Sequence, residues 1–263
     1  MGSWQTAGDP SVYGQLEIDM TTSQAFLQKL NSDHGLKVGI SELVGKITAL
    51  VLKERPEMNG MIRLGRIYLR SSVNLFYQVN VPGTGSGHVK NAMLLGLTVP
   101  DAEKKSLREI SQELQHKAAK IRSGEDSQMS DSVNKFALLP WQLVRWVLNI
   151  SSFLNYDLNL PLHHFGLPKD SFGSVMITNV GSLGVDTAWA PLVPYTRVPL
   201  LLTIGAVKER PWVVAGSVVV RPVMKIGFTF DHRFMDGVHA AAMSKLFHHY
   251  FENPELLNER GEL

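Results

Sequence analysis

The chain has 263 residues, of which 44% are hydrophobic and 19% are charged, and its formal net charge is +2. These values lie near globular averages and exclude a disordered, collagen-like or coiled-coil protein. The small net charge, with no block of like charges, gives no reason to expect a nucleic-acid partner. The chain contains no cysteine, which excludes disulfides, thiolate metal sites and a cysteine nucleophile. The first twenty residues show no signal peptide, so we expect a cytoplasmic protein.

The beginning of the chain predicts a strand followed by two helices. Residues 12–19 alternate as a strand does, and a helical pattern follows that Gly35 ends. A second helix is expected to begin near an N-cap at Ser41 and to end before Pro56, with apolar residues on one face.

The middle of the chain predicts further strands and a third helix. Two strands are expected over residues 62–83 and a third over 93–102, and the Gly-rich stretch 83–88 between them indicates a flexible turn. An amphipathic helix is expected over residues 106–124.

The end of the chain predicts strands and a last helix. Strand alternation returns at residues 173–179 and 221–230, with two apolar runs between them, and a helix is expected over 239–253. Helices on a mixed or antiparallel sheet define an α+β or three-layer α/β class. We expect a single domain over residues 1–263.

Residues 131–168 interrupt this order and form an apolar insertion that includes Trp141 and Trp146. Polar residues break the segment, so it holds no run of about 20 apolar residues that could span a membrane. Three interpretations stay open: a buried helix or oligomer contact, which we favour; a helix at a membrane surface through residues 136–156; and a lid over an apolar acyl site. Apolar residues recur at helical spacing, at positions 139, 143, 147, 150 and 154.

A histidine follows the last predicted strand, in the sequence FTFDHRFMDG. Strand alternation places His232 on the same face as Ile226, Phe228 and Phe230. If the strand continues through Asp231, we expect a protected imidazole with a lowered pKa, which suits a general base. A structural histidine in a core or interface is the alternative.

The segment DHRFMDG resembles the D-H-R-x-x-D-G signature of the catalytic domain of dihydrolipoyl acyltransferases of 2-oxo-acid dehydrogenase complexes, which are relatives of chloramphenicol acetyltransferase. Three other stretches resemble that family in the same order: PEMN at residues 56–59, DAEKKSLREISQEL at 101–114 and MITNVGSLGV at 176–185. The resemblance extends from about residue 40 to about residue 250, except for the insertion. It implies a chloramphenicol-acetyltransferase-like fold.

The resemblance implies a CoA-dependent acyltransferase in which His232 is the general base that deprotonates a thiol. Thr178 stands where the family has serine and is expected to stabilise the oxyanion, with a structural threonine as the alternative. Asp236 is expected to orient the loop and to cap the following helix. Further residues are expected to be structural at the site: Asp231, Arg233, Asn179, Gly181 and Gly237, the last as the tight backbone position.

The resemblance also implies partners. The family assembles as trimers with each site at a subunit boundary, so His232 and Thr178 should come from different chains of a homotrimer or a larger symmetric oligomer. Coenzyme A is expected as the acyl-CoA substrate, and lipoate only if a separate lipoyl or carrier protein supplies it. No metal is expected, because adjacent histidine pairs do not converge on one ion.

The chain departs from the family pattern at its beginning. It shows neither the lipoyl and subunit-binding domains nor the basic opening helix. We therefore expect that an arginine partner for Asp236 is either missing from the protein or lies outside the given sequence. The alternative function is a catalytically silent trimeric or cage-forming module, beside a membrane or in a dehydrogenase-like assembly.

Overall fold

The computed structural model describes residues 9–81, 93–122, 140–158, 160 and 170–257. The strands are β1 (Ser11–Asp19), β2 (Gly60–Arg63), β3 (Arg66–Leu69), β4 (Leu75–Val81), β5 (Met93–Val99), β6 (Val175–Asn179), β7 (Leu200–Ile204), β8 (Lys208–Val214) and β9 (Ser217–Asp231). The longer helices are α1 (Thr21–His34), α2 (Ile40–Glu54), α3 (Leu107–Arg122), α5 (Trp141–Ser152) and α6 (Gly237–Glu252).

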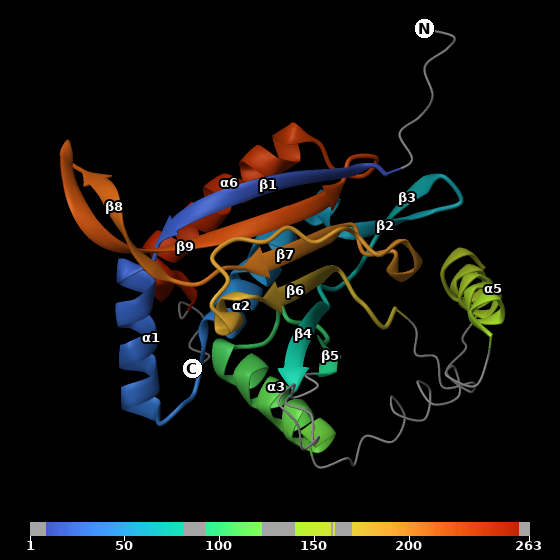
Figure 1. Cartoon of the computed structure of the whole chain (residues 1–263), viewed down its shortest axis with the longest axis horizontal. Coiled ribbons are helices and arrows are strands. Elements are labelled where there is room, and N and C mark those ends of the chain that lie inside the picture. Colours follow the sequence, from blue (N-terminus) through green and yellow to red (C-terminus); the bar gives the residue numbers. More distant parts are fainter. Residues whose placement is uncertain (1–8, 82–92, 123–139, 159, 161–169, 258–263) are drawn as a thin grey trace, which may run out of the picture.

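A mixed seven-stranded sheet organises the molecule (Figure 1). Its strand order is β1-β9-β7-β6-β4-β5, and β8 pairs with the first part of β9. The pairs β4–β6 and β6–β7 are parallel, while the other pairs of this sheet are antiparallel. Strand β9 therefore pairs with three others and carries its C-terminal end to one edge of the fold.

The main core lies between this sheet and its helices, because α2 and α6 each present an apolar stripe to it. Leu43, Ile47 and Val51 of α2 are fully buried, as are Phe247 and Phe251 of α6. Figure 1 shows both helices behind the sheet. A smaller cluster forms on the opposite face of the sheet, from Phe76, Met176, Val198 and Leu201.

The mixed sheet with helices in one domain-sized unit agrees with the predicted class, but two details differ. The region predicted as two strands forms β2, β3 and β4, because Leu64 and Gly65 adopt φ of 46° and 73° and reverse the chain. Helix α2 begins at Ile40 after Gly39, whose N–H is bound by the Glu42 carboxylate at 3.1 Å, so Ser41 is not the N-cap. The Gly-rich stretch 83–88 lies outside the described residues.

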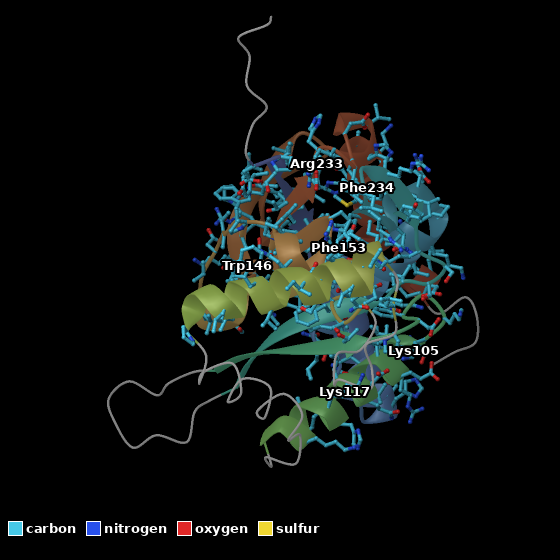
Figure 2. The ribbon with its side chains drawn as sticks, turned by 90° about the vertical axis from the view of Figure 1, so that its right-hand side faces the viewer. Lys105, Lys117, Trp146, Phe153, Arg233 and Phe234 are labelled. Atoms are coloured by element: carbon cyan, nitrogen blue, oxygen red, sulfur yellow. The ribbon has the colours of Figure 1, made fainter. Side chains whose placement is uncertain are left out.

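The apolar insertion forms helix α5, followed by the π-helical turn η2 (Phe153–Asp157). Its helical spacing is confirmed, but the interpretation as a buried helix is wrong for the single chain. The buried Ser152 faces the body of the protein and donates to the Tyr195 carbonyl at 3.4 Å. Figure 2 shows α5 lying across this end of the molecule. Its apolar side chains are largely exposed, at Leu143, Trp146, Val147 and Ile150.

Oligomer contact and the other interpretations of the insertion stay predictions. Among the helices that the structure describes, none combines the length and apolarity needed to cross a membrane.

Helix α6 gives a direct test of the core. We expect Phe247→Ala to lower the free energy of unfolding by about 3–5 kcal/mol, because the ring is fully buried and its removal leaves a cavity. Val238→Ala on the same helix is the control, since Val238 is 72% exposed and should change stability by less than about 0.5 kcal/mol. Urea denaturation measures both, and equal effects of the two substitutions would contradict the packing described.

Candidate functional site

His232 lies at the start of a tight turn between β9 and α6. Its backbone N–H donates to the Pro10 carbonyl at 2.9 Å, while the N–H groups of Phe234 and Met235 both donate to the Asp231 carbonyl at 2.9 Å. Phe234 and Met235 are buried, which anchors the turn in the core. The backbone at His232 is therefore held from both sides.

The predicted face of His232 is correct. The rings of Phe228 and Phe230 stack at 6.0 Å between centroids, and those of Phe230 and His232 stack at 6.4 Å with 24° between their planes. Pairing of β9 with β1 continues through Asp231, opposite Ser11. The prediction of a protected surface is wrong for the single chain, however, because the side chain of His232 is exposed.

An ion pair stabilises the same turn. The guanidinium of Arg233 binds both carboxylate oxygens of Asp231, at 3.0 and 2.7 Å, and the Arg233 N–H binds the same carboxylate at 2.9 Å. The side chain of Asp231 is 11% exposed and that of Arg233 is 64% exposed. The hydrogen bond to Asp231 raises the pKa of Arg233 above its usual value. The pair therefore closes the turn on itself.

Asp236 is the N-cap of α6. Its carboxylate accepts hydrogen bonds from the N–H groups of Val238 and His239, at 3.0 and 3.1 Å, and lies 2.7 Å from Nδ1 of His239. The backbone N–H of His239, and next its side chain, lower the pKa of Asp236 below the usual 3.8. Asp236 thus orients the helix after the turn, with His239 as its partner.

Gly237 behaves differently from the expectation. A Cβ atom placed there would meet no heavy atom within 4 Å, and its φ is not positive. The single chain therefore gives no steric reason for glycine at this position.

Thr178 and Asn179 end strand β6 and point to opposite faces of the sheet. Asn179 Nδ2 donates to the Ser41 hydroxyl of α2 at 2.9 Å, and its Oδ1 accepts from the Ser182 N–H at 3.0 Å. Gly181 follows where a Cβ would come within 2.5 Å of the Gly205 carbonyl oxygen, so glycine is needed for this close approach. Asn179 and Gly181 thus fix the turn after Thr178.

The sheet register keeps Thr178 and His232 apart. Thr178 pairs with Thr203 of β7, and Thr203 pairs with Gly227 of β9. His232 is five residues beyond Gly227, which corresponds to roughly 17 Å along the strand. Gly227 and His232 also have opposite parity, so Thr178 and His232 occupy opposite faces as well as opposite ends. One chain does not bring the two side chains together.

Three further residues contact the predicted site residues, and the sequence analysis did not predict these contacts. Pro10 receives the N–H of His232, Ser41 binds Asn179, and His239 pairs with Asp236. Only His239 had a local signal, because Asp at an N-cap with a polar side chain three residues later is a capping pattern. The other two contacts join segments far apart in the sequence.

Comparison with known families identifies the chain. The family model for 2-oxoacid dehydrogenases acyltransferase (catalytic domain) matches residues 2–133 and 169–258. The chain therefore belongs to this family. The match leaves out residues 134–168, which lie within the predicted insertion and include α5.

Curated relatives carry names of the same kind. The chain is 24% identical over 251 residues to the dihydrolipoyllysine-residue acetyltransferase component of the pyruvate dehydrogenase complex of Zymomonas mobilis, covering 93% of this chain and 45% of the relative. It is 28% identical over 246 residues to the mitochondrial dihydrolipoyllysine-residue succinyltransferase component of the 2-oxoglutarate dehydrogenase complex of Saccharomyces cerevisiae, covering 90% and 42%. The chain spans about half the length, or less, of these relatives.

Solved structures show the same fold. The dihydrolipoamide acetyltransferase of Azotobacter vinelandii superposes with a TM-score of 0.67 at 19% identity, covering 95% of this chain and 84% of that one. A truncated catalytic core of the 2-oxoacid dehydrogenase multienzyme complex of Thermoplasma acidophilum superposes with a TM-score of 0.64 at 20% identity. The match covers 94% of this chain and 89% of that one. These likenesses confirm the predicted fold class.

The contact between β6 and α2 can be tested by a double-mutant cycle. We expect Asn179→Ala and Ser41→Ala each to destabilise the fold, and the two together to cost less than their sum by about 0.5–1.5 kcal/mol, because they remove one shared hydrogen bond. Urea denaturation of the four proteins gives the coupling. Strict additivity would show that the bond contributes nothing.

The N-cap makes a pH-dependent prediction. Because the folded-state pKa of Asp236 is lowered, its ionised form adds stability above the usual value of 3.8, and this contribution is lost as the pH falls below it. Asp236→Asn should therefore melt below the wild type at pH 6, and the gap should narrow below pH 3.8. Thermal melts across this range measure it, and a gap that widens in acid would contradict the assignment.

Proposed function

We propose that this chain is an acyltransferase that moves an acyl group between a coenzyme A thioester and a thiol acceptor, such as a dihydrolipoyl group on a separate protein. The observation that carries the proposal is the intact DHRFMDG segment, which places an exposed imidazole on a firmly held turn in a chain of the 2-oxoacid dehydrogenase acyltransferase family. The names of two relatives, a dihydrolipoyllysine-residue acetyltransferase component and a dihydrolipoyllysine-residue succinyltransferase component, support acyl transfer with a dihydrolipoyl group as the acceptor.

In the proposed reaction, the neutral imidazole of His232 accepts the proton of the attacking thiol. The resulting thiolate forms a new C–S bond to the thioester carbonyl carbon, and negative charge develops on the carbonyl oxygen. When the original C–S bond breaks, the proton passes from the imidazolium to the departing thiolate. Both thiol groups come from the substrates, so no acyl-enzyme forms.

The hydroxyl of Thr178 is proposed to stabilise the oxyanion and to come from a second copy of the chain, because the sheet register separates it from His232 within one chain. Thr178 and His232 are roughly 17 Å apart along the strand direction and lie on opposite faces. Contact between the His232 end of one copy and the Thr178 end of another would unite them. A related solved structure is the cubic core of the pyruvate dehydrogenase multienzyme complex, which supports a symmetric assembly.

Under this proposal, Asp236 and the Asp231–Arg233 pair are positioning residues. The N-cap fixes the start of α6, and the ion pair fixes the turn, so that the imidazole holds its place without a direct partner from either group. Their role is mechanical, and proton transfer remains with His232.

The proposal predicts a specific loss of activity. With acetyl-CoA and dihydrolipoamide, the protein should release free CoA, and His232→Ala should reduce that release to background because the thiol loses its base. Thr178→Val should lower kcat by roughly 100-fold to 1,000-fold, as the removal of an oxyanion donor does, whereas Thr178→Ser keeps the hydroxyl and should stay near wild type. Chromatographic separation of free CoA from acetyl-CoA follows the release, because the transfer leaves the total number of thiol groups unchanged.

Two results would contradict the proposal. If His232→Ala turned over as fast as the wild type, His232 would not be the general base. If a correctly assembled wild type showed no turnover with acetyl, succinyl and longer acyl donors, the catalytically silent module would be favoured.

A further inference from the structure

The imidazole of His232 lies at the end of a row of three rings along β9. The ring centroids of Phe228 and Phe230 are 6.0 Å apart with 14° between the ring planes, and those of Phe230 and His232 are 6.4 Å apart with 24°. Both separations lie within the range of roughly 4.5–7 Å that aromatic pairs adopt. The row forms because every second side chain of a strand projects to the same face.

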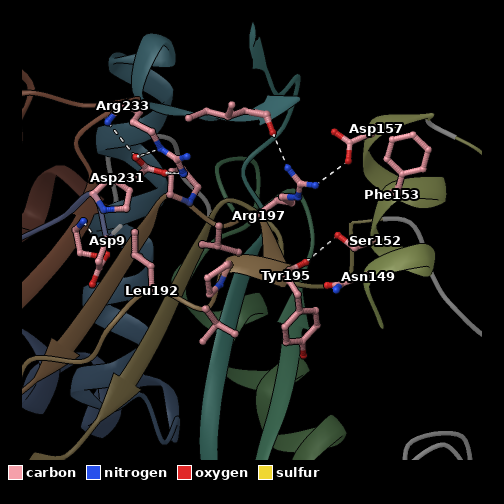
Figure 3. Close-up of a pocket in the computed structure, with 17 residues that line it drawn as sticks. Asp9, Asn149, Ser152, Phe153, Asp157, Leu192, Tyr195, Arg197, Asp231 and Arg233 are labelled. Carbon is pink, nitrogen blue, oxygen red and sulfur yellow. Dashed lines mark hydrogen bonds and ion pairs between the residues drawn. The ribbon is translucent and has the colours of Figure 1, made fainter. Parts of the chain in front are cut away.

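The acidic side chains next to His232 are engaged elsewhere. The Asp231 carboxylate binds the Arg233 guanidinium at 2.7 Å, and Figure 3 shows this pair at the edge of a cavity that His232 does not line. The Asp236 carboxylate caps α6 and binds His239. Within the described part of the chain, neither ring nitrogen of His232 has a hydrogen-bond partner. Stacking on Phe230 is therefore the contact that the imidazole makes in the single chain.

The two phenylalanine rings are fixed by the core. Phe230 is 2% exposed and Phe228 is 8% exposed, and both belong to the main core. Gly14 of β1 pairs with Phe228, and a Cβ atom on Gly14 would lie 2.0 Å from the ring atom Cζ of Phe228. Glycine at this position thus leaves the space that the Phe228 ring occupies. The exposed imidazole at the end of the row rests on rings that are held in place.

We propose that Phe230 is a positioning residue for the base: its ring fixes the plane of the His232 imidazole, and Phe228 holds the ring of Phe230. The inference rests on the acyltransferase function proposed above. A general base needs a defined direction toward the proton that it accepts. Histidine usually obtains this direction from a hydrogen bond to its second ring nitrogen. Here an aromatic pair supplies it, and such a pair favours the stacked orientation by roughly 3-fold to 10-fold.

The first test separates kcat from KM. Phe230→Leu removes the ring and keeps an apolar side chain in the core. We expect kcat for CoA release from acetyl-CoA, with dihydrolipoamide as acceptor, to fall by roughly 3-fold to 10-fold. The KM values of both substrates should stay unchanged, because Phe230 is buried and does not touch them. Chromatography of free CoA measures the release, and a kcat equal to that of the wild type would overturn the proposal.

A conservative variant tests whether the ring itself is needed. Phe230→Tyr keeps an aromatic ring beside His232 and should restore kcat to within about twofold of the wild type, because the stacked pair is retained. The assembled mass is checked for each variant, and all assays are run well below the lowest melting temperature. If Phe230→Tyr lost as much activity as Phe230→Leu, the ring would not be the positioning element and the proposal would fail.

Phe247→Leu is the matched control for a loss of stability. Phe247 is a fully buried ring of the same core, and its aromatic contact is with Phe251, at 6.2 Å between centroids. The same substitution at Phe247 should lower the melting temperature to a similar extent and leave kcat unchanged. If Phe247→Leu lowered kcat as much as Phe230→Leu, stability alone would explain the loss, which would overturn the proposal.

Crystal structures of the wild type and Phe230→Leu test the orientation without turnover. The wild-type imidazole should stack on Phe230 in a single orientation. In Phe230→Leu it should turn out of this plane or occupy more than one orientation. An imidazole that keeps the same plane in both proteins would overturn the proposal, whatever the activity. If the variant loses the orientation but the wild type transfers no acyl group, the proposed function fails while the positioning of His232 by Phe230 is supported.

Discussion

The pairing of β6, β7 and β9 is the constraint on which the proposed chemistry depends. It fixes Thr178 level with Gly227 and places His232 five residues further along β9 and on the other face of the sheet. A β-sheet of this size does not bend to close such a gap, since its ladder of hydrogen bonds sets both register and face. A site that uses both side chains must therefore form between two copies, each giving a different end. Such a contact is heterologous, and it closes into a ring when the rotation between copies allows it.

In the single chain, His232 and Thr178 are each held in place at their own end of the sheet. His232 is exposed, yet its backbone is held by Pro10, by the buried Phe234 and Met235, and by the capped start of α6. Thr178 ends a buried strand whose following turn is fixed by Asn179 and by the close approach at Gly181. Both groups are thus positioned before assembly, which limits the entropy that the contact must overcome.

The sequence predicted the local parts of this arrangement well. Alternation along β9 identified the face of His232, because side chains of a strand alternate whatever lies around it. The cap at Asp236 and the end of α1 at Gly35, where φ is 61°, also followed from local chemistry. The contact of Ser41 with Asn179 joins segments 138 residues apart, and no local pattern encodes it. Helix α5 shows the same limit. The helical spacing of its apolar residues predicted an apolar face, but it did not predict that Ser152 would contact the body of the protein.

The central claim is that the acyl-transfer site is shared between two copies, and a hybrid assembly tests it most directly. Chains carrying His232→Ala and chains carrying Thr178→Val are unfolded together, refolded as a mixture and assayed for CoA release, with the assembled mass checked in each sample. Random mixing should give about one quarter of the contacts an intact His232 and an intact Thr178. We predict that the mixture regains activity that neither variant has alone. A fully assembled mixture that stays as inactive as its components would contradict a shared site.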